Sequence, residues 1–211
     1  MEDSMNKRQH EILKTALNQL IKLEKELGQP LIYNLGYREV LQAQEVSPFF
    51  EDFKRIKGAG GADAKAKGYP KIEAKSKKSK IMSRTDKYNW KIGFEFDKQN
   101  DKIRRDQTLQ YDAFYFTVFS GDNEMPLVTA IAKNDDSIKS VKNVLKEEQK
   151  KFVKRLAEVT KKGKRISRDS VKIQLKQLFD INELIWVIDQ KQVTLSEVQK
   201  LFGYKNLTTK Q

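Results

Sequence analysis

The segment Ala113–Phe119, AFYFTVF, limits what this chain can fold into more than any other stretch, because it is apolar nearly throughout. Such a run favours a central strand that is buried on both faces. A half-buried strand is expected over Trp90–Asp97, where apolar side chains alternate with polar or small ones. Leu127–Ala132 and Ile72–Ser76 are two further strand candidates. The chain therefore carries the strands of a sheet, one of which needs cover on both sides.

Helical patterns lie on both sides of these strands in the sequence. Apolar residues recur at three- and four-residue steps along Asn6–Leu27 and along Ser137–Lys162. Shorter helices are expected over Tyr37–Glu45, Asn100–Gln110 and Ser170–Phe179, and from the capping box Thr194–Glu197 onward. The last of these faintly resembles a helix-turn-helix element, and a plain terminal helix is the alternative.

These elements predict an α/β fold in which a mixed central sheet is flanked by helices. A chain of 211 residues suits a single domain, residues 1–211, and 38% hydrophobic residues are enough for a core. Within that domain we expect an N-terminal helical addition at 1–36, a core at 37–132 and a helical C-terminal part at 133–211.

Basic residues outnumber acidic ones, with 42 Lys and Arg against 29 Asp and Glu, which gives a net charge of +13. The excess is concentrated in Lys54–Lys98 and Ser137–Asp180, each with 14 basic and 5 acidic residues. Such a distribution attracts polyanions, and nucleic acid is the commonest polyanion that a soluble basic protein meets. The alternatives are a generally basic surface and, for the second segment, the solvated face of a lysine-rich helix.

Several function classes are excluded or not expected. The chain has no cysteine, which excludes disulfides, thiolate metal sites and cysteine nucleophiles. Its one histidine, His10, lies among charged residues near the start of a helix, so catalysis by a histidine base is not expected. Nothing resembles a signal peptide, and no apolar run approaches the ~18 residues needed to span a bilayer. We expect a soluble, cytoplasmic protein without a membrane partner.

Two carboxylates, Asp63 and Glu73, stand inside the lysine-rich stretch Gly58–Lys80. On a strand, Glu73 and Lys75 would project from the same face about 7 Å apart, and the residues between Asp63 and Glu73 leave room for a turn. Two adjacent carboxylates repel, and a hard cation such as Mg²⁺ removes that repulsion because it prefers oxygen ligands. It would polarise a phosphate oxygen, while Lys75 stabilises the charge that grows on the phosphoryl group. The pattern indicates a phosphodiester-cleaving site; the alternative is that both acids only neutralise neighbouring lysines.

Asp63, followed after nine residues by Glu73-Ala74-Lys75, resembles the motif of the PD-(D/E)XK nucleases, which are best known as type II restriction endonucleases. The expected elements from residue 37 to residue 132 follow a similar order: a helix, a strand hairpin with the motif, a third strand at Trp90–Asp97, a helix, a buried strand and another strand. The resemblance implies a restriction-endonuclease-like core in which Asp63 and Glu73 bind Mg²⁺ and Lys75 is the catalytic lysine.

The chain departs from that motif at Ala62, which stands where the motif has a proline, and the spacing is short. Many members of the superfamily add an acid from the preceding helix to the metal site. Glu45 is the preferred candidate here, and Glu39 is the alternative. Acid-x-lysine also occurs elsewhere in the chain, so a second register stays open, formed by Asp52, Asp63 and Lys65.

The resemblance implies a Mg²⁺-dependent, site-specific endonuclease that hydrolyses phosphodiester bonds of double-stranded DNA. It also implies a homodimer, because a two-fold protein matches a palindromic site. The candidate DNA-binding residues are Lys77, Lys78, Arg84, Arg104 and Arg105. Two alternatives stay open: a non-enzymatic basic nucleic-acid-binding protein, and a repair or recombination nuclease of the same superfamily without site specificity.

Overall fold

The structure is a computed structural model that describes residues 37–56, 62–82, 86–121, 125–163 and 169–204, together with scattered positions between 8 and 26. Those scattered positions are helical. The predicted helix over Asn6–Leu27 otherwise lies outside the described residues, as does the rest of the expected addition at 1–36. Among the described helices, none is long and apolar enough to cross a membrane.

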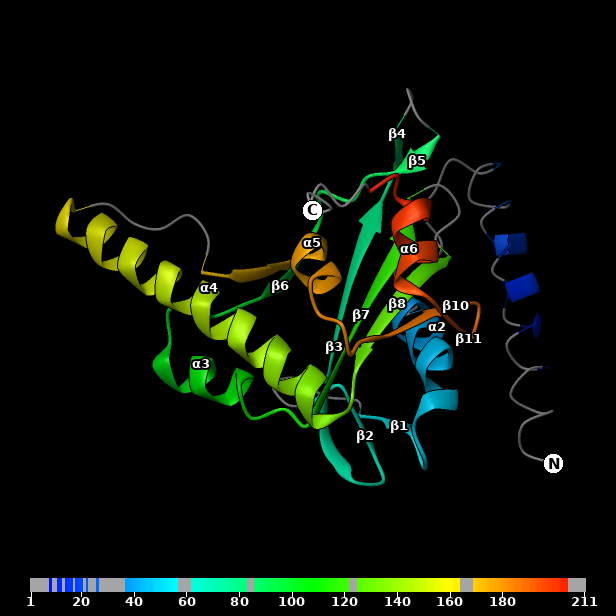
Figure 1. Ribbon diagram of the computed structural model, residues 1–211, viewed down its shortest axis with the longest axis horizontal. Coiled ribbons are helices and arrows are strands. Elements are labelled where there is room, and N and C mark those ends of the chain that lie inside the picture. The colour runs from blue at the N-terminus through cyan, green and yellow to red at the C-terminus, as the bar shows by residue number, and fades with distance from the viewer. Residues whose placement is uncertain are drawn as a thin grey trace, which may run out of the picture.

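A seven-stranded mixed sheet forms the centre of the fold, with the strand order β1-β2-β3-β7-β8-β10-β11 (Figure 1). Neighbouring strands are antiparallel except β3 and β7, which run parallel. Parallel neighbours need a crossover connection, and the segment between β3 and β7 supplies it. The strands are β1 (Lys54–Arg55), β2 (Ala64–Ala66), β3 (Tyr69–Ser79), β7 (Ala113–Ser120), β8 (Pro126–Ala132), β10 (Ile185–Ile188) and β11 (Lys191–Val193).

One face of the sheet is covered by α2 (Tyr37–Val46) and the short 3₁₀ helix η2 (Ser47–Phe49). Their contribution to the core includes Val46, which is fully buried with side chains of β3, β7 and β8. Because side chains alternate along a strand, Ile72 and Tyr115 point to this face.

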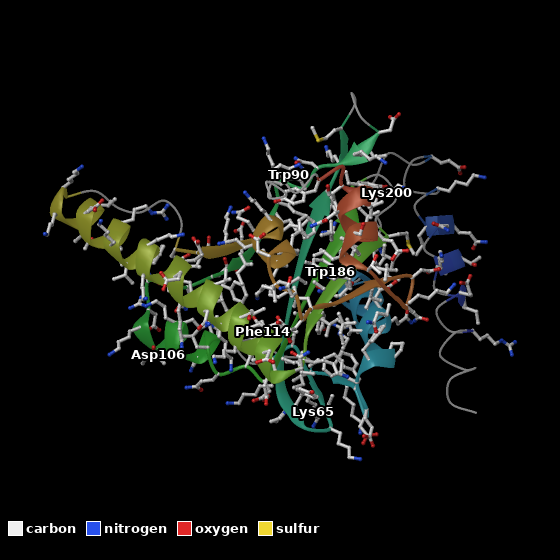
Figure 2. All side chains as sticks on the ribbon, viewed as in Figure 1. Lys65, Trp90, Asp106, Phe114, Trp186 and Lys200 are labelled. Atoms are coloured by element: carbon white, nitrogen blue, oxygen red, sulfur yellow. The ribbon has the colours of Figure 1, made fainter. Side chains whose placement is uncertain are left out.

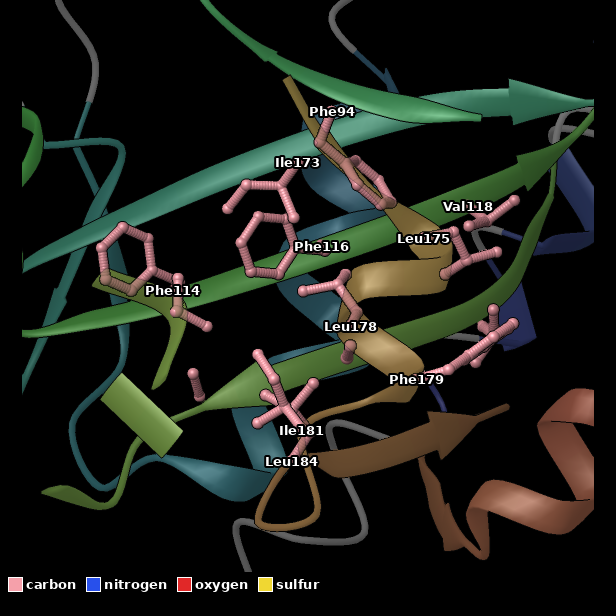
Figure 3. Close-up of a cluster of buried hydrophobic side chains, with 14 of the residues drawn as sticks. Phe94, Phe114, Phe116, Val118, Ile173, Leu175, Leu178, Phe179, Ile181 and Leu184 are labelled. Carbon is pink, nitrogen blue, oxygen red and sulfur yellow. The ribbon is translucent and has the colours of Figure 1, made fainter. Parts of the chain in front are cut away.

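The opposite face carries the larger core (Figure 3). Phe114 and Phe116 of β7 point into it, where Phe116 lies between aromatic rings of β6 and Phe114. Leu178 closes this core from above the sheet. The covering elements are β6 (Gly93–Phe96), α4 (Asp135–Lys161), β9 (Val171–Gln174), α5 (Leu175–Phe179) and α6 (Leu195–Leu201), and α3 (Lys102–Thr108) is bonded to α4.

Two small two-stranded sheets are not hydrogen-bonded to the central one. The pair β4 (Ile81–Met82) and β5 (Lys87–Tyr88) continues from the end of β3. The second pair joins β6 to β9. In Figure 1, α4 and α3 extend away from the central sheet on the side of this second pair.

The structure confirms the α/β class with a mixed sheet flanked by helices. All eight residues of β7 are buried, as predicted for a strand covered on both faces. The half-buried strand expected over Trp90–Asp97 is present as β6, but it pairs with β9 instead of forming the third strand of the central sheet. β1 takes that place in the meander that leads to β3.

The prediction of a helical C-terminal part is wrong for three segments. Val171–Gln174 forms β9, and β10 and β11 form a hairpin that extends the central sheet. The pattern of a four-residue segment such as Val171–Gln174 fits a helix or a strand equally well. Its pairing with β6 makes it a strand. α6 is not the second helix of a helix-turn-helix, because the element before it is a strand, and the residues after Tyr204 lie outside the described part of the chain. The capping box of Thr194 and Glu197 is confirmed.

Candidate active site

The hairpin of β2 and β3 brings Asp63 to the middle of β3. Gly68 forms its turn with φ of 78°, a backbone angle that residues other than glycine rarely adopt. The Asp63 N–H donates to the Ile72 carbonyl at 2.9 Å, and Asp63 Oδ2 accepts from the Ala74 N–H at 2.8 Å. The Asp63 side chain therefore caps a backbone group that stands between Glu73 and Lys75.

Glu73 and Lys75 project from one face of β3, as their spacing predicts. Lys75 Nζ lies 2.6 Å from Glu73 Oε1, and the two side chains are 23% and 6% exposed. The same ammonium lies 5.1 Å from the centre of the Phe96 ring, which favours a cation there. The ion pair therefore lies at the edge of the larger core, where Lys75 still reaches solvent.

Tyr111 belongs to this site, and the sequence reasoning missed it. Its hydroxyl forms a hydrogen bond with Glu73, and burial together with the Glu73 charge raises the pKa of the phenol. Arg104 of α3 lies close enough for its charge to act on the same hydroxyl. Tyr111 precedes β7, and Asp112 N–H donates to the Lys71 carbonyl at 2.7 Å. That bond ties the start of β7 to β3 and fixes Tyr111 beside Glu73.

The ion pair with Lys75 does not fully offset the cost of burying the charged Glu73 carboxylate. Burial raises the pKa of the Glu73 carboxyl; Lys75 opposes this, and repulsion from Asp63 adds to it, so that the pKa stays above its ordinary value. A raised carboxyl pKa means that the ionised form is destabilised relative to water. Burial is thus the main cost of ionising Glu73, and a cation beside the two carboxylates would offset it.

α2 contacts the site through Gln42, whose Nε2 donates to the Lys75 carbonyl at 2.8 Å. Glu45 lies elsewhere: it is buried, and its Oε2 accepts from the Gln190 N–H at 2.9 Å. Glu39 is exposed, and its charge acts on the Tyr115 hydroxyl together with the charges of Asp63 and Glu73. The structure thus places Glu39, and not Glu45, on the side of the helix nearer to Asp63.

The candidate DNA-binding residues lie in different surroundings. Lys77 follows Lys75 on the same face of β3, and its Nζ lies 3.1 Å from Glu95 Oε1, which Lys172 also contacts at 3.1 Å. Lys78 is half-buried and has a partner of its own. Arg105 donates to the carbonyls of Gln99 at 2.6 Å and Asn100 at 3.2 Å, so it holds a loop. Arg84 lies outside the described residues.

The residues of the alternative register, Asp52, Asp63 and Lys65, are not bonded to one another as the residues around Glu73 are. Asp52 is exposed in the turn before β1, with φ of 53°, whereas Asp63 is bonded to β3. Lys65 is exposed on β2.

The donor set fits a hard divalent cation that keeps several waters. It consists of the carboxylates of Asp63 and Glu73 and of the Ala74 carbonyl. This carbonyl points to the same edge of β3 as the Ala74 N–H, which donates a hydrogen bond to Asp63. Within the described ranges, no group of three or more His, Cys, Asp or Glu side chains gathers in a way that could hold a metal. A cation here would therefore depend on two carboxylates, the backbone and water.

No protein-family model matches this chain, and no curated protein matches it either.

Proposed function

We propose that this protein is a magnesium-dependent endonuclease of the PD-(D/E)XK type that hydrolyses phosphodiester bonds in double-stranded DNA. The observation that carries the proposal is the convergence of three side chains. Asp63 is bonded to Ala74, and the residues on either side of Ala74 form the 2.6 Å ion pair of Glu73 with Lys75. If Asp63 and Glu73 only neutralised surface lysines, there would be no reason for Glu73 to be buried beside Asp63.

The fold around the site supports the proposal. An antiparallel meander ends in β3, which carries Glu73 and Lys75, and a crossover that includes α3 leads to the parallel strand β7. This order of elements agrees with a restriction-endonuclease-like core in which the motif hairpin precedes a helix and a buried strand.

Each residue of the site has a defined task in this proposal. Asp63 and Glu73 would hold Mg²⁺, which supplies polarisation of a phosphate oxygen and a positive charge beside the reacting group. Lys75 Nζ reaches solvent next to Glu73, so it can stabilise the charge that grows on the phosphoryl group when water attacks phosphorus and the P–O bond breaks. Tyr111 and Gln42 position Glu73 and β3, respectively.

Site specificity and a homodimer belong to the proposal as the type II form of this activity. The test is incubation of the purified protein with plasmid DNA, with Mg²⁺ and with a chelator. Discrete fragments with Mg²⁺ would support a site-specific enzyme, and a smear would favour a repair or recombination nuclease. DNA binding without cleavage under any divalent ion would contradict hydrolysis and favour the non-enzymatic binder.

A further inference from the structure

A groove of about 500 Å³ runs between α3 and α4. One wall is α3, from which Arg105 and Asp106 line the groove. The other wall is the middle of α4. The lining residues are Arg105, Asp106, Lys146, Gln149, Lys150, Val153 and Lys154.

Buried hydrogen bonds hold the two walls together. Gln149 of α4 donates from Nε2 to Gln99 Oε1 at 2.9 Å and to the Arg105 carbonyl at 3.2 Å. Gln99 in turn donates to Thr108 Oγ1 at 3.2 Å. Because these side chains are buried and bonded across the elements, the groove is a fixed feature of the fold.

Four basic side chains and the single acid Asp106 line the groove, and its exposed surface is mostly apolar. Lys146, Lys150 and Lys154 recur at four-residue steps, so they form one stripe along α4. Lys150 Nζ is paired with Glu147 Oε1 at 2.6 Å. Within the described part of the chain, the ammonium groups of Lys146 and Lys154 have no ion-pair partner.

We propose that this groove binds the phosphate backbone of duplex DNA. Lys146 and Lys154 are eight residues apart, about 12 Å along the helix axis, a length over which one strand of a duplex carries three to four phosphates. The lysine stripe along α4 favours a polyanion as the occupant, and duplex DNA is the polyanion that the proposed function requires. DNA in the groove would lie against α3, which also carries Arg104, whose charge acts on the Tyr111 hydroxyl of the candidate site.

This inference rests on the DNA-binding half of the proposed function, and its test does not use cleavage. The affinity of the full chain for a short fluorescent duplex is measured in EDTA at a series of salt concentrations. Each phosphate contact contributes about 0.9 to the slope of log affinity against log salt. The double variant Lys146→Ala/Lys154→Ala is expected to lower that slope by about 2. Between about 50 and 200 mM salt, its affinity would then fall roughly tenfold less than that of the unaltered protein.

Lys191→Ala/Lys200→Ala is the matched control, with the same change of charge. Both lysines are exposed, and Lys200 of α6 lies far from Asp106 of α3 (Figure 2). The control is expected to change the slope by less than half as much.

Equal slopes for the two double variants, or no DNA binding by the unaltered chain, would overturn the groove proposal. Poly-glutamate bound as tightly as DNA, and weakened equally by the groove variant, would assign the groove to an acidic protein instead. A lowered slope without any cleavage by the unaltered protein would keep the groove and refute hydrolysis. Cleavage by the unaltered protein, together with an unchanged slope for the groove variant, would support hydrolysis and refute the groove.

Discussion

The Asp63 carboxylate accepts a hydrogen bond from the Ala74 N–H at 2.8 Å, one step beyond the last backbone pair of β2 with β3. The aspartate thus takes the place of a strand partner on the β2 edge of β3, whereas the other edge pairs Ala74 with Tyr115 of β7. It joins the two halves of the candidate motif through one bond, and it brings a second carboxylate beside Glu73.

Replacement of Asp63 separates its structural role from its chemical one. Asp63→Asn keeps an oxygen that can accept from Ala74, so its unfolding free energy should stay within about 0.5 kcal/mol of the unaltered protein. Asp63→Ala loses the acceptor at an exposed position, which costs about 1 kcal/mol. Both variants should lose cleavage. Urea denaturation and plasmid digestion measure the two effects, and activity in Asp63→Asn would contradict the metal-binding role.

Glu73→Gln should stabilise the metal-free protein at neutral pH. A carboxyl whose pKa is raised on folding binds its proton more tightly in the folded state. The folded protein therefore loses stability as pH rises from the ordinary carboxyl range through the raised pKa of Glu73. The advantage of Glu73→Gln should vanish below the ordinary carboxyl pKa. Thermal unfolding of both proteins in EDTA at acidic and neutral pH measures this difference. If the two proteins were equally stable at neutral pH, the prediction would be contradicted.

Mg²⁺ should stabilise the unaltered protein but not Glu73→Gln. A ligand that binds only the folded state adds about 2.7 kcal/mol at a concentration of about 100 times its Kd. Thermal unfolding over a Mg²⁺ titration is the measurement, with K⁺ at matched ionic strength as the control. An equal rise in Tm for both proteins would place the ion elsewhere.

Tyr111→Phe should move the acid limb of the cleavage pH profile to higher pH. The Tyr111 hydroxyl lowers the pKa of Glu73 through its hydrogen bond, so its loss raises that pKa further. Tyr69→Phe is the matched control, because its hydroxyl donates to the Lys133 carbonyl at 2.7 Å, outside the site. Superimposable profiles for Tyr111→Phe and the unaltered protein would show that the phenol does not act on Glu73.

Phe116→Ala should cost about 3–5 kcal/mol of unfolding free energy, the usual cost of a large cavity in a packed core. Phe116 is 1% exposed, and its ring centre lies 5.2 Å from that of Phe94. Ile103→Ala, at a residue that is 68% exposed, should change stability by less than about 0.5 kcal/mol. Urea denaturation of both variants checks the contrast, and a loss below about 1 kcal/mol for Phe116→Ala would contradict the packing described here.

The parts that could be predicted from the sequence depend on local geometry. Alternation along β3 places Glu73 and Lys75 on one face, and a turn at Gly68 is enough to return Asp63 to the same strand. The buried strand β7 follows from its unbroken apolar run.

Contacts between distant segments could not be predicted in this way. Tyr111 reaches Glu73, and Gln42 reaches Lys75, only because the sheet and α2 bring them together. The strand β9 is only four residues long, and it pairs with β6, which lies about 80 residues earlier in the chain, so the pairing leaves no local signal. Which of Glu39 and Glu45 lies nearer to Asp63 depends on how α2 is rotated against the sheet, and the sequence of the helix does not determine that rotation.

Digestion of supercoiled plasmid by the unaltered protein and by Glu73→Gln and Lys75→Ala, with Lys71→Ala as a control from the same strand, tests the central claim most directly. We predict cleavage by the unaltered protein and by Lys71→Ala with Mg²⁺, and none with a chelator. Glu73→Gln and Lys75→Ala should still bind DNA but leave the plasmid uncut. Cleavage by either of them at the rate of the unaltered protein, or cleavage in the chelator, would contradict the assignment of this site.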